Sequence, residues 1–169
     1  MINLFYRDIL QIKKQSKGDF VEKMIFSSDE IANSIKETIA AGGHFPLVVT
    51  GTSMQPFLKN GEDVVWLRAC TLSDVKKGAI LLFERVDGSL VLHRVNEILP
   101  DRRLVMGGDG QTWNEKIDPD NVIAVVDSVE KNGKKIPCGA LRYRLKVALW
   151  LWLKPVRYYI MKIYKMFRR

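Results

Sequence analysis

The sequence predicts a mainly β protein with a single antiparallel sheet domain. Between residues 44 and 137, short apolar runs alternate with turn dipeptides such as Asn60-Gly61 and Asn132-Gly133. Helical spacing of apolar residues occurs only outside this region, at the two ends of the chain. A length of 169 residues, 47% of them hydrophobic, suits one sizeable core. We therefore expect an N-terminal helical segment (1–43), a β domain (44–137) and a basic, aromatic, amphipathic tail (138–169).

Two helices are expected before the sheet. The first is short and lies within residues 1–14, where apolar residues share one face. The second begins at a capping box formed by Ser27 and Glu30 and ends at Gly42-Gly43. Its apolar stripe consists of Ile31, Ile35 and Ile39.

Apolar and β-branched runs predict the strands of the sheet. They cover residues 47–49, 64–67, 79–86, 89–98, 104–106 and 122–129. Asp87-Gly88 has the composition of a two-residue hairpin turn, and Asn132-Gly133 predicts a final hairpin. The segment Gly107-Gly108-Asp109-Gly110 is too rich in glycine for regular structure and is expected to form a loop.

The positive charge of the chain is concentrated in its tail. Residues 140–169 contain nine Lys or Arg and no Asp or Glu, whereas the other 139 residues contain 18 basic and 19 acidic side chains. A nearly neutral body argues against a distributed nucleic-acid-binding face, so nucleic acid is not an expected partner. The tail is instead expected to meet an anionic surface.

Cysteine usage and the N-terminus indicate a chain that remains in a reducing compartment. Cys70 and Cys138 are far apart and lack the spacing of a disulfide framework or a zinc site, so no cofactor is expected. Arg7 and Asp8 fall where a secretion signal would be apolar, and no run approaches the roughly 20 apolar residues of a membrane span. These features predict a cytoplasmic protein.

Ser53 is the candidate nucleophile. It follows the apolar run 47–49 on a tight turn in which Gly51 permits unusual backbone dihedrals and Pro56 prevents a regular helix. A serine hydroxyl is a weak nucleophile, so catalysis requires a base within hydrogen-bonding reach. Strand alternation places His93 on the apolar face with Val91 and Val95, where its imidazole stays neutral.

A carboxylate that fixes the tautomer of the histidine would complete the site. Asp109 is the leading candidate, because the glycines around it allow its short side chain to point inward. Glu115, Asp118 and Asp120 are alternatives. The other histidine, His44, is interpreted as a loop residue.

Five segments together resemble the signal peptidase I / LexA-type serine peptidases. They are Gly51-Thr52-Ser53-Met54-Gln55-Pro56, Leu58-Lys59-Asn60-Gly61-Glu62-Asp63-Val64-Val65, Lys77-Gly78-Ala79-Ile80-Leu81-Leu82-Phe83, Leu92-His93-Arg94-Val95 and Gly108-Asp109. The His-Arg-Val segment is similar to the endoplasmic-reticulum and archaeal type, which implies a coiled antiparallel β domain with Ser53, His93 and Asp109 as catalytic residues. In that type a second acidic pair follows the Gly-Asp, and here only Glu115 occupies the corresponding stretch.

The resemblance implies a serine endopeptidase that cleaves a leader or signal-like peptide presented in extended form along an edge strand. On the turn at Gly51 and Thr52, the Ser53 N–H and a hydroxyl from Thr50 or Thr52 would stabilise the oxyanion. Two alternatives remain: a self-cleaving regulator of LexA type, for which Ala41-Gly42 offers the dipeptide, and a catalytically inactive peptide-binding module of the same fold.

The tail has the composition of a helix that lies in a membrane interface. Residues 147–153 are wholly apolar and carry two tryptophans, Lys154-Pro155 breaks the helix, and basic residues flank the apolar face of the segment after it. We therefore expect peripheral association with the inner membrane face. The alternative is a tail that folds back on the body or binds an acidic protein. The predicted contact residues are Trp150, Trp152, Arg157, Lys162 and Lys165.

Overall fold

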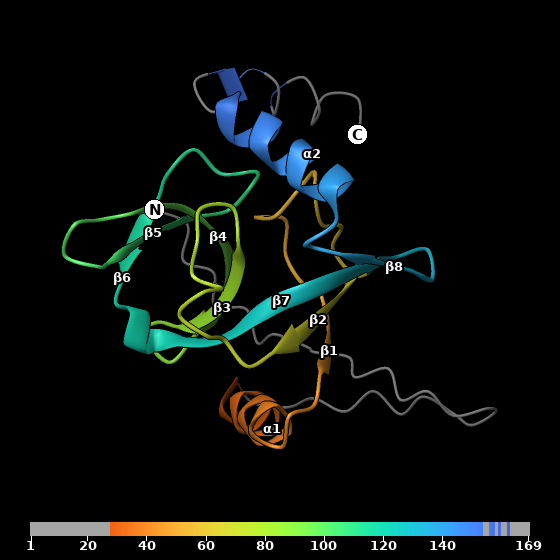
Figure 1. The fold of residues 1–169 in the computed structure, drawn as a ribbon, viewed down its shortest axis with the longest axis vertical. Helices are drawn as coiled ribbons and strands as arrows, with labels where there is room; N and C mark the ends of the chain where they lie inside the picture. Colours follow the sequence, from red (N-terminus) through yellow and green to blue (C-terminus); the bar gives the residue numbers. More distant parts are fainter. Residues whose placement is uncertain (1–27, 154–155, 158, 160–161, 163–169) are drawn as a thin grey trace.

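The computed structural model describes residues 28–153, 156–157, 159 and 162, and it shows a mainly β protein (Figure 1). An eight-stranded antiparallel sheet forms the body, with one helix before it in the chain and one after it. The mainly β prediction is therefore confirmed. The helix expected within residues 1–14 and the capping residue Ser27 lie outside the described residues.

The strands follow the order β1-β2-β7-β3-β4-β5-β6, and β8 pairs with β7. Every pair is antiparallel. The sequence did not predict β6 or the short 3₁₀ helix η1 (Pro119–Asn121), because three residues are too few to show a period. The strands are β1 (Phe45–Val48), β2 (Val64–Arg68), β3 (Ile80–Glu84), β4 (Leu90–Ile98), β5 (Leu104–Gly107), β6 (Glu115–Ile117), β7 (Val122–Lys131) and β8 (Lys134–Pro137).

One of the two expected two-residue hairpin turns is confirmed. Asn132 and Gly133 join β7 to β8 with φ values of 49° and 74°, the positive values that a two-residue hairpin turn requires. The turn at Asp87-Gly88 is wider than expected: the Arg85 N–H donates to the Ser89 carbonyl over 2.9 Å, which leaves three residues between them.

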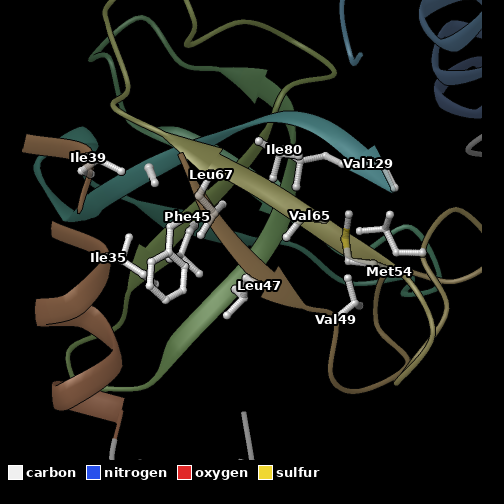
Figure 2. Close-up of a cluster of buried hydrophobic side chains, with 14 of the residues drawn as sticks. Ile35, Ile39, Phe45, Leu47, Val49, Met54, Val65, Leu67, Ile80 and Val129 are labelled. Carbon is white, nitrogen blue, oxygen red and sulfur yellow. The ribbon is translucent and has the colours of Figure 1, made fainter. Parts of the chain in front are cut away.

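Alternation along β3 and β4 divides the core into two clusters, one on each face of the sheet. Ile80 and Leu82 enter the first cluster with residues of β1, β2 and β7 (Figure 2). Leu81 and Phe83 enter the second, with side chains from β4, β5 and β6. His93 and Arg94, as successive residues of β4, therefore point to opposite faces.

Both helices contribute side chains to the first cluster. In α1 (Ser28–Ala40), the predicted stripe Ile31, Ile35 and Ile39 is buried, and the Gly43 N–H donates to the Thr38 carbonyl beyond the helix end. In α2 (Leu141–Trp152), Tyr143 and Val147 enter the same cluster. The helices lie at opposite ends of the sheet (Figure 1).

The packing of α2 corrects part of the predicted membrane contact. Trp150 is buried and its indole N–H donates to the Asp109 carbonyl over 3.2 Å, while the buried Arg157 donates to the Trp150 carbonyl over 3.1 Å. Trp150 faces the body because its indole N–H finds a partner there, whereas Arg157 folds back onto α2 and lies over the Trp150 ring. Trp152 and Lys162 are exposed, and Lys165 lies outside the described residues. Across the described part of the chain, no helix has the length and apolarity to cross a membrane.

Candidate active site

Ser53 lies half-buried on the turn that follows β1. Gly51 has a φ of 79°, which glycine adopts without strain, and its N–H donates to Asn60 Oδ1 over 3.0 Å. After Ser53, the Leu58 N–H donates to the Met54 carbonyl over 2.9 Å, and both of these side chains are buried. The turn is thus anchored on either side of the serine.

The buried carboxylate of Asp63 stabilises the end of this turn. Asp63 Oδ2 accepts the Lys59 N–H over 2.8 Å and Lys131 Nζ over 2.7 Å, and Lys131 also donates to the Phe57 carbonyl. This network was not predicted from the sequence. Its only sequence signal is the acidic pair Glu62-Asp63 directly before the apolar run of β2.

The loop between β5 and β6 packs against the main chain of Ser53. The Gly110 N–H donates to the Ser53 carbonyl over 2.7 Å. A Cβ atom at Gly108 would collide with the same carbonyl oxygen, so the close approach requires glycine. Because Trp150 holds the Asp109 carbonyl, a chain of contacts runs from α2 through this loop to the serine turn.

His93 points into the second cluster, on the side of Val91 and Val95, as predicted. The centroids of the Phe83 and Trp113 rings each lie 6.1 Å from that of the imidazole, and His93 is only 2% exposed. Burial lowers the pKa of His93 below its ordinary value, and this effect outweighs the opposing influence of the nearby Glu115 carboxylate. The imidazole is consequently neutral at neutral pH.

The carboxylate beside His93 belongs to Glu115, the first residue of β6. Glu115 Oε1 lies 3.0 Å from His93 Nδ1, and Arg85 donates to both carboxylate oxygens over 2.7 Å. A carboxylate clamped in this way only accepts hydrogen bonds, so Nδ1 carries the proton and donates to Glu115. The lone pair of the neutral ring is then on Nε2, which has no hydrogen-bond partner among the described residues.

Asp109 does not occupy the position predicted for it. Its two carboxylate oxygens accept Arg94 Nε over 2.8 Å and Arg94 Nη2 over 2.7 Å, and both residues are at most 1% exposed. Burial disfavours the charged form of Arg94, but Asp109 outweighs it and the pKa of Arg94 is raised. Asp109 pairs with Arg94 on the face of β4 opposite His93, so Glu115 takes the position beside the imidazole.

The other predicted acids lie on η1 and take no part in this cluster. Asp118 accepts the Asp120 N–H over 3.1 Å as the N-cap of η1, and both side chains are exposed. Arg85 and Arg94, which hold the two carboxylates, were missed as site residues. Each is a basic residue within or next to an apolar strand, and that position is the only signal the sequence offers.

The hydroxyl and the backbone N–H of Ser53 are the groups that would take part in catalysis. Within residues 28–153 the structure has no hydrogen bond between the Ser53 hydroxyl and the His93 imidazole, and the Ser53 N–H has no acceptor there. The Gly51 N–H is engaged by Asn60, and Thr52 is exposed. The Ser53 N–H is therefore available to an oxyanion without breaking a bond.

In the described part of the chain, no group of three or more His, Cys, Asp or Glu side chains is arranged to bind a metal ion. Comparison of the chain with models of protein families, with curated proteins and with solved structures finds no significant match.

Proposed function

We propose that the protein is a serine endopeptidase of signal peptidase/LexA type, with Ser53 as nucleophile, His93 as general base and Glu115 as the residue that positions the base. The observation that carries this proposal is the buried His93–Glu115 contact, which fixes the imidazole tautomer. The loop that leads to Glu115 also packs on Ser53, so both halves of the site are held by one segment.

In the proposed reaction, His93 Nε2 accepts the hydroxyl proton of Ser53 while Oγ attacks the carbonyl carbon of the scissile peptide bond. The oxyanion that forms accepts the Ser53 N–H. When the intermediate collapses, the imidazolium transfers its proton to the departing amine, and an acyl-serine ester remains. Water, deprotonated by the same imidazole, then hydrolyses the ester and restores the serine.

The strand order supports binding of an extended peptide. β1 pairs only with β2 among the described strands, so its other edge is open to a peptide strand that would run toward Ser53. The substrate class we propose is a leader or signal-like peptide. The missing hydrogen bond between Ser53 and His93 fits a site that tightens when such a peptide binds, as in many substrate-free enzymes.

Self-cleavage of LexA type at Ala41-Gly42 is disfavoured by the topology. This dipeptide precedes β1 and Ser53 follows it, so the extended strand separates the two (Figure 1). The inactive peptide-binding module is the second candidate, and the observation in its favour is the absence of a Ser53–His93 hydrogen bond in the described residues.

A fluorophosphonate probe tests the proposed function, because it forms a covalent adduct only with an activated serine. We expect the wild-type protein to gain the mass of one adduct, located on Ser53 by peptide mapping, and the Ser53→Ala variant to gain none. Ser89→Ala is the matched control, since Ser89 lies in the β3–β4 hairpin, and it should label like the wild type. An unlabelled wild-type protein would favour the inactive module.

The labelling rate of the wild type should also depend on pH. Only the neutral imidazole can accept the serine proton, and burial lowers the pKa of His93 from its ordinary value of 6.5. The rate should therefore stay on a plateau at neutral pH and fall in acid, with its midpoint below 6.5. A midpoint well on the alkaline side of neutrality would instead indicate a lysine base.

A further inference from the structure

We propose that the outward face of α2 docks the protein on an anionic lipid membrane. This face carries a line of exposed large apolar side chains, which we call the α2 stripe: Leu141 (68% exposed), Leu145 (60%), Leu149 (57%) and Trp152 (75%). Their spacing of four, four and three residues places them on one side of a helix with 3.6 residues per turn. The opposite side, with Tyr143, Val147 and Trp150, is buried against the body.

The α2 stripe is unusual because it is apolar on the side that faces away from the core. A helix that packs on a sheet normally presents polar residues to water. Here, α2 is apolar on both sides. It is attached to the body through the buried Tyr143, Val147 and Trp150, and the Trp150 indole N–H donates to the Asp109 carbonyl. An apolar line of this kind marks an interaction surface.

The charges beside the stripe indicate an anionic partner. Helical spacing puts Arg142 and Lys146 along one side of the stripe and Arg144 along the other, and all three are exposed. None of them forms an ion pair with a described residue, and the chain has no acidic residue after Glu130. A second copy would bring like charges together across the contact, whereas anionic lipid headgroups would neutralise them.

The geometry matches that of an interfacial helix. Leucine and tryptophan side chains would enter the boundary between headgroups and acyl chains, and the flanking arginines and lysine would contact phosphate groups. Lys162 is exposed beyond the helix end and adds to the positive charge. Because α2 also holds the loop that packs on Ser53, docking would fix the orientation of the candidate active site above the membrane.

Vesicle sedimentation of the full-length chain tests this surface directly. We expect the wild type to pellet with phosphatidylcholine/phosphatidylglycerol vesicles and to bind vesicles of phosphatidylcholine alone much more weakly. The double variant Leu145→Glu/Leu149→Glu should lower the partition coefficient by at least about tenfold. Removing charge with Arg142→Gln or Arg144→Gln should cost about fivefold each, and less at high salt.

The matched control is Leu72→Glu/Val86→Glu, which adds the same charge at two residues outside α2 that are 80% and 104% exposed. It should bind like the wild type, and circular dichroism should show both double variants folded.

Equal binding of the two double variants, or no binding by the wild type, would overturn the proposal. A wild-type dimer that the α2 variant dissociates, without vesicle binding, would assign the surface to a second copy instead. Ser53→Ala should bind vesicles normally, so this result does not depend on catalysis.

Discussion

Replacing His93 by alanine is expected to lower the rate of fluorophosphonate labelling at Ser53 by about 10²- to 10⁴-fold, the usual contribution of a general base. The imidazole is neutral at neutral pH because it is buried, and its Nδ1–H is held by Glu115. Removing it leaves the serine without a proton acceptor on that side of the site. The measurement is the second-order rate constant of labelling, determined by intact-mass spectrometry.

The chain offers a matched control for this substitution in its other histidine. His44 is exposed in the segment between α1 and β1, and His44→Ala should label at the wild-type rate. Thermal unfolding must show His93→Ala folded at the assay temperature, since the substitution also leaves a cavity beside Phe83. A folded His93→Ala protein with an unchanged labelling rate would refute the assignment of His93 as the base.

Local sequence patterns predicted most of the sheet, because each strand carries its own signal. Apolar runs made β3 and β4 recognisable, and alternation along β4 placed His93 correctly with Val91 and Val95. The short edge strand β6 was missed, since Glu115 and its neighbours pair with β5 through the backbone and carry no apolar period. The predicted length of the β3–β4 turn was one residue too short, because Arg85 pairs with Ser89 and leaves three residues in the turn.

The acid of the site could not be chosen from the sequence. Asp109 and Glu115 lie in the same loop region, and the choice depends on which face of β4 each carboxylate meets after folding. Arg94 is a strong, buried partner for Asp109, and Arg85 is positioned to hold Glu115 beside His93. The partners of each ion pair are distant in the sequence and form no local pattern. Neither pair could therefore be inferred before the tertiary contacts were known.

The tail illustrates the same limit. Its composition predicted an amphipathic helix but not which of its faces would be buried. Composition alone treats Trp150 and Trp152 as equivalent aromatic residues, and the structure assigns them different surroundings: Trp150 donates to the Asp109 carbonyl and Trp152 is exposed. That distinction depends on where the Asp109 loop lies, which is a long-range property.

The second large effect is expected on stability. Asp109→Asn should lower the free energy of unfolding by about 3–5 kcal/mol, because it leaves the Arg94 guanidinium buried without a counter-charge. Arg94 would keep its hydrogen bond to the Gly78 carbonyl, 2.7 Å long, and its contact with the Phe57 ring, but neither neutralises it. Equilibrium unfolding in urea measures the change, and Asp120→Asn, an exposed control, should remain within about 0.5 kcal/mol of the wild type.

Glu115→Gln separates a structural role from a catalytic one. Its partner Arg85 is partly exposed, so water can solvate the freed guanidinium and the stability cost should be about 1 kcal/mol or less. The labelling rate should nevertheless fall more than tenfold, because an amide can present its N–H to His93 Nδ1 and favour the wrong tautomer. For Asp109→Asn, assayed where it is folded, the labelling rate should fall less than for Glu115→Gln. If the Asp109→Asn protein is instead as stable as the wild type and is labelled more slowly than Glu115→Gln, Asp109 is the acid. The ion pair between Asp109 and Arg94 must then rearrange during catalysis.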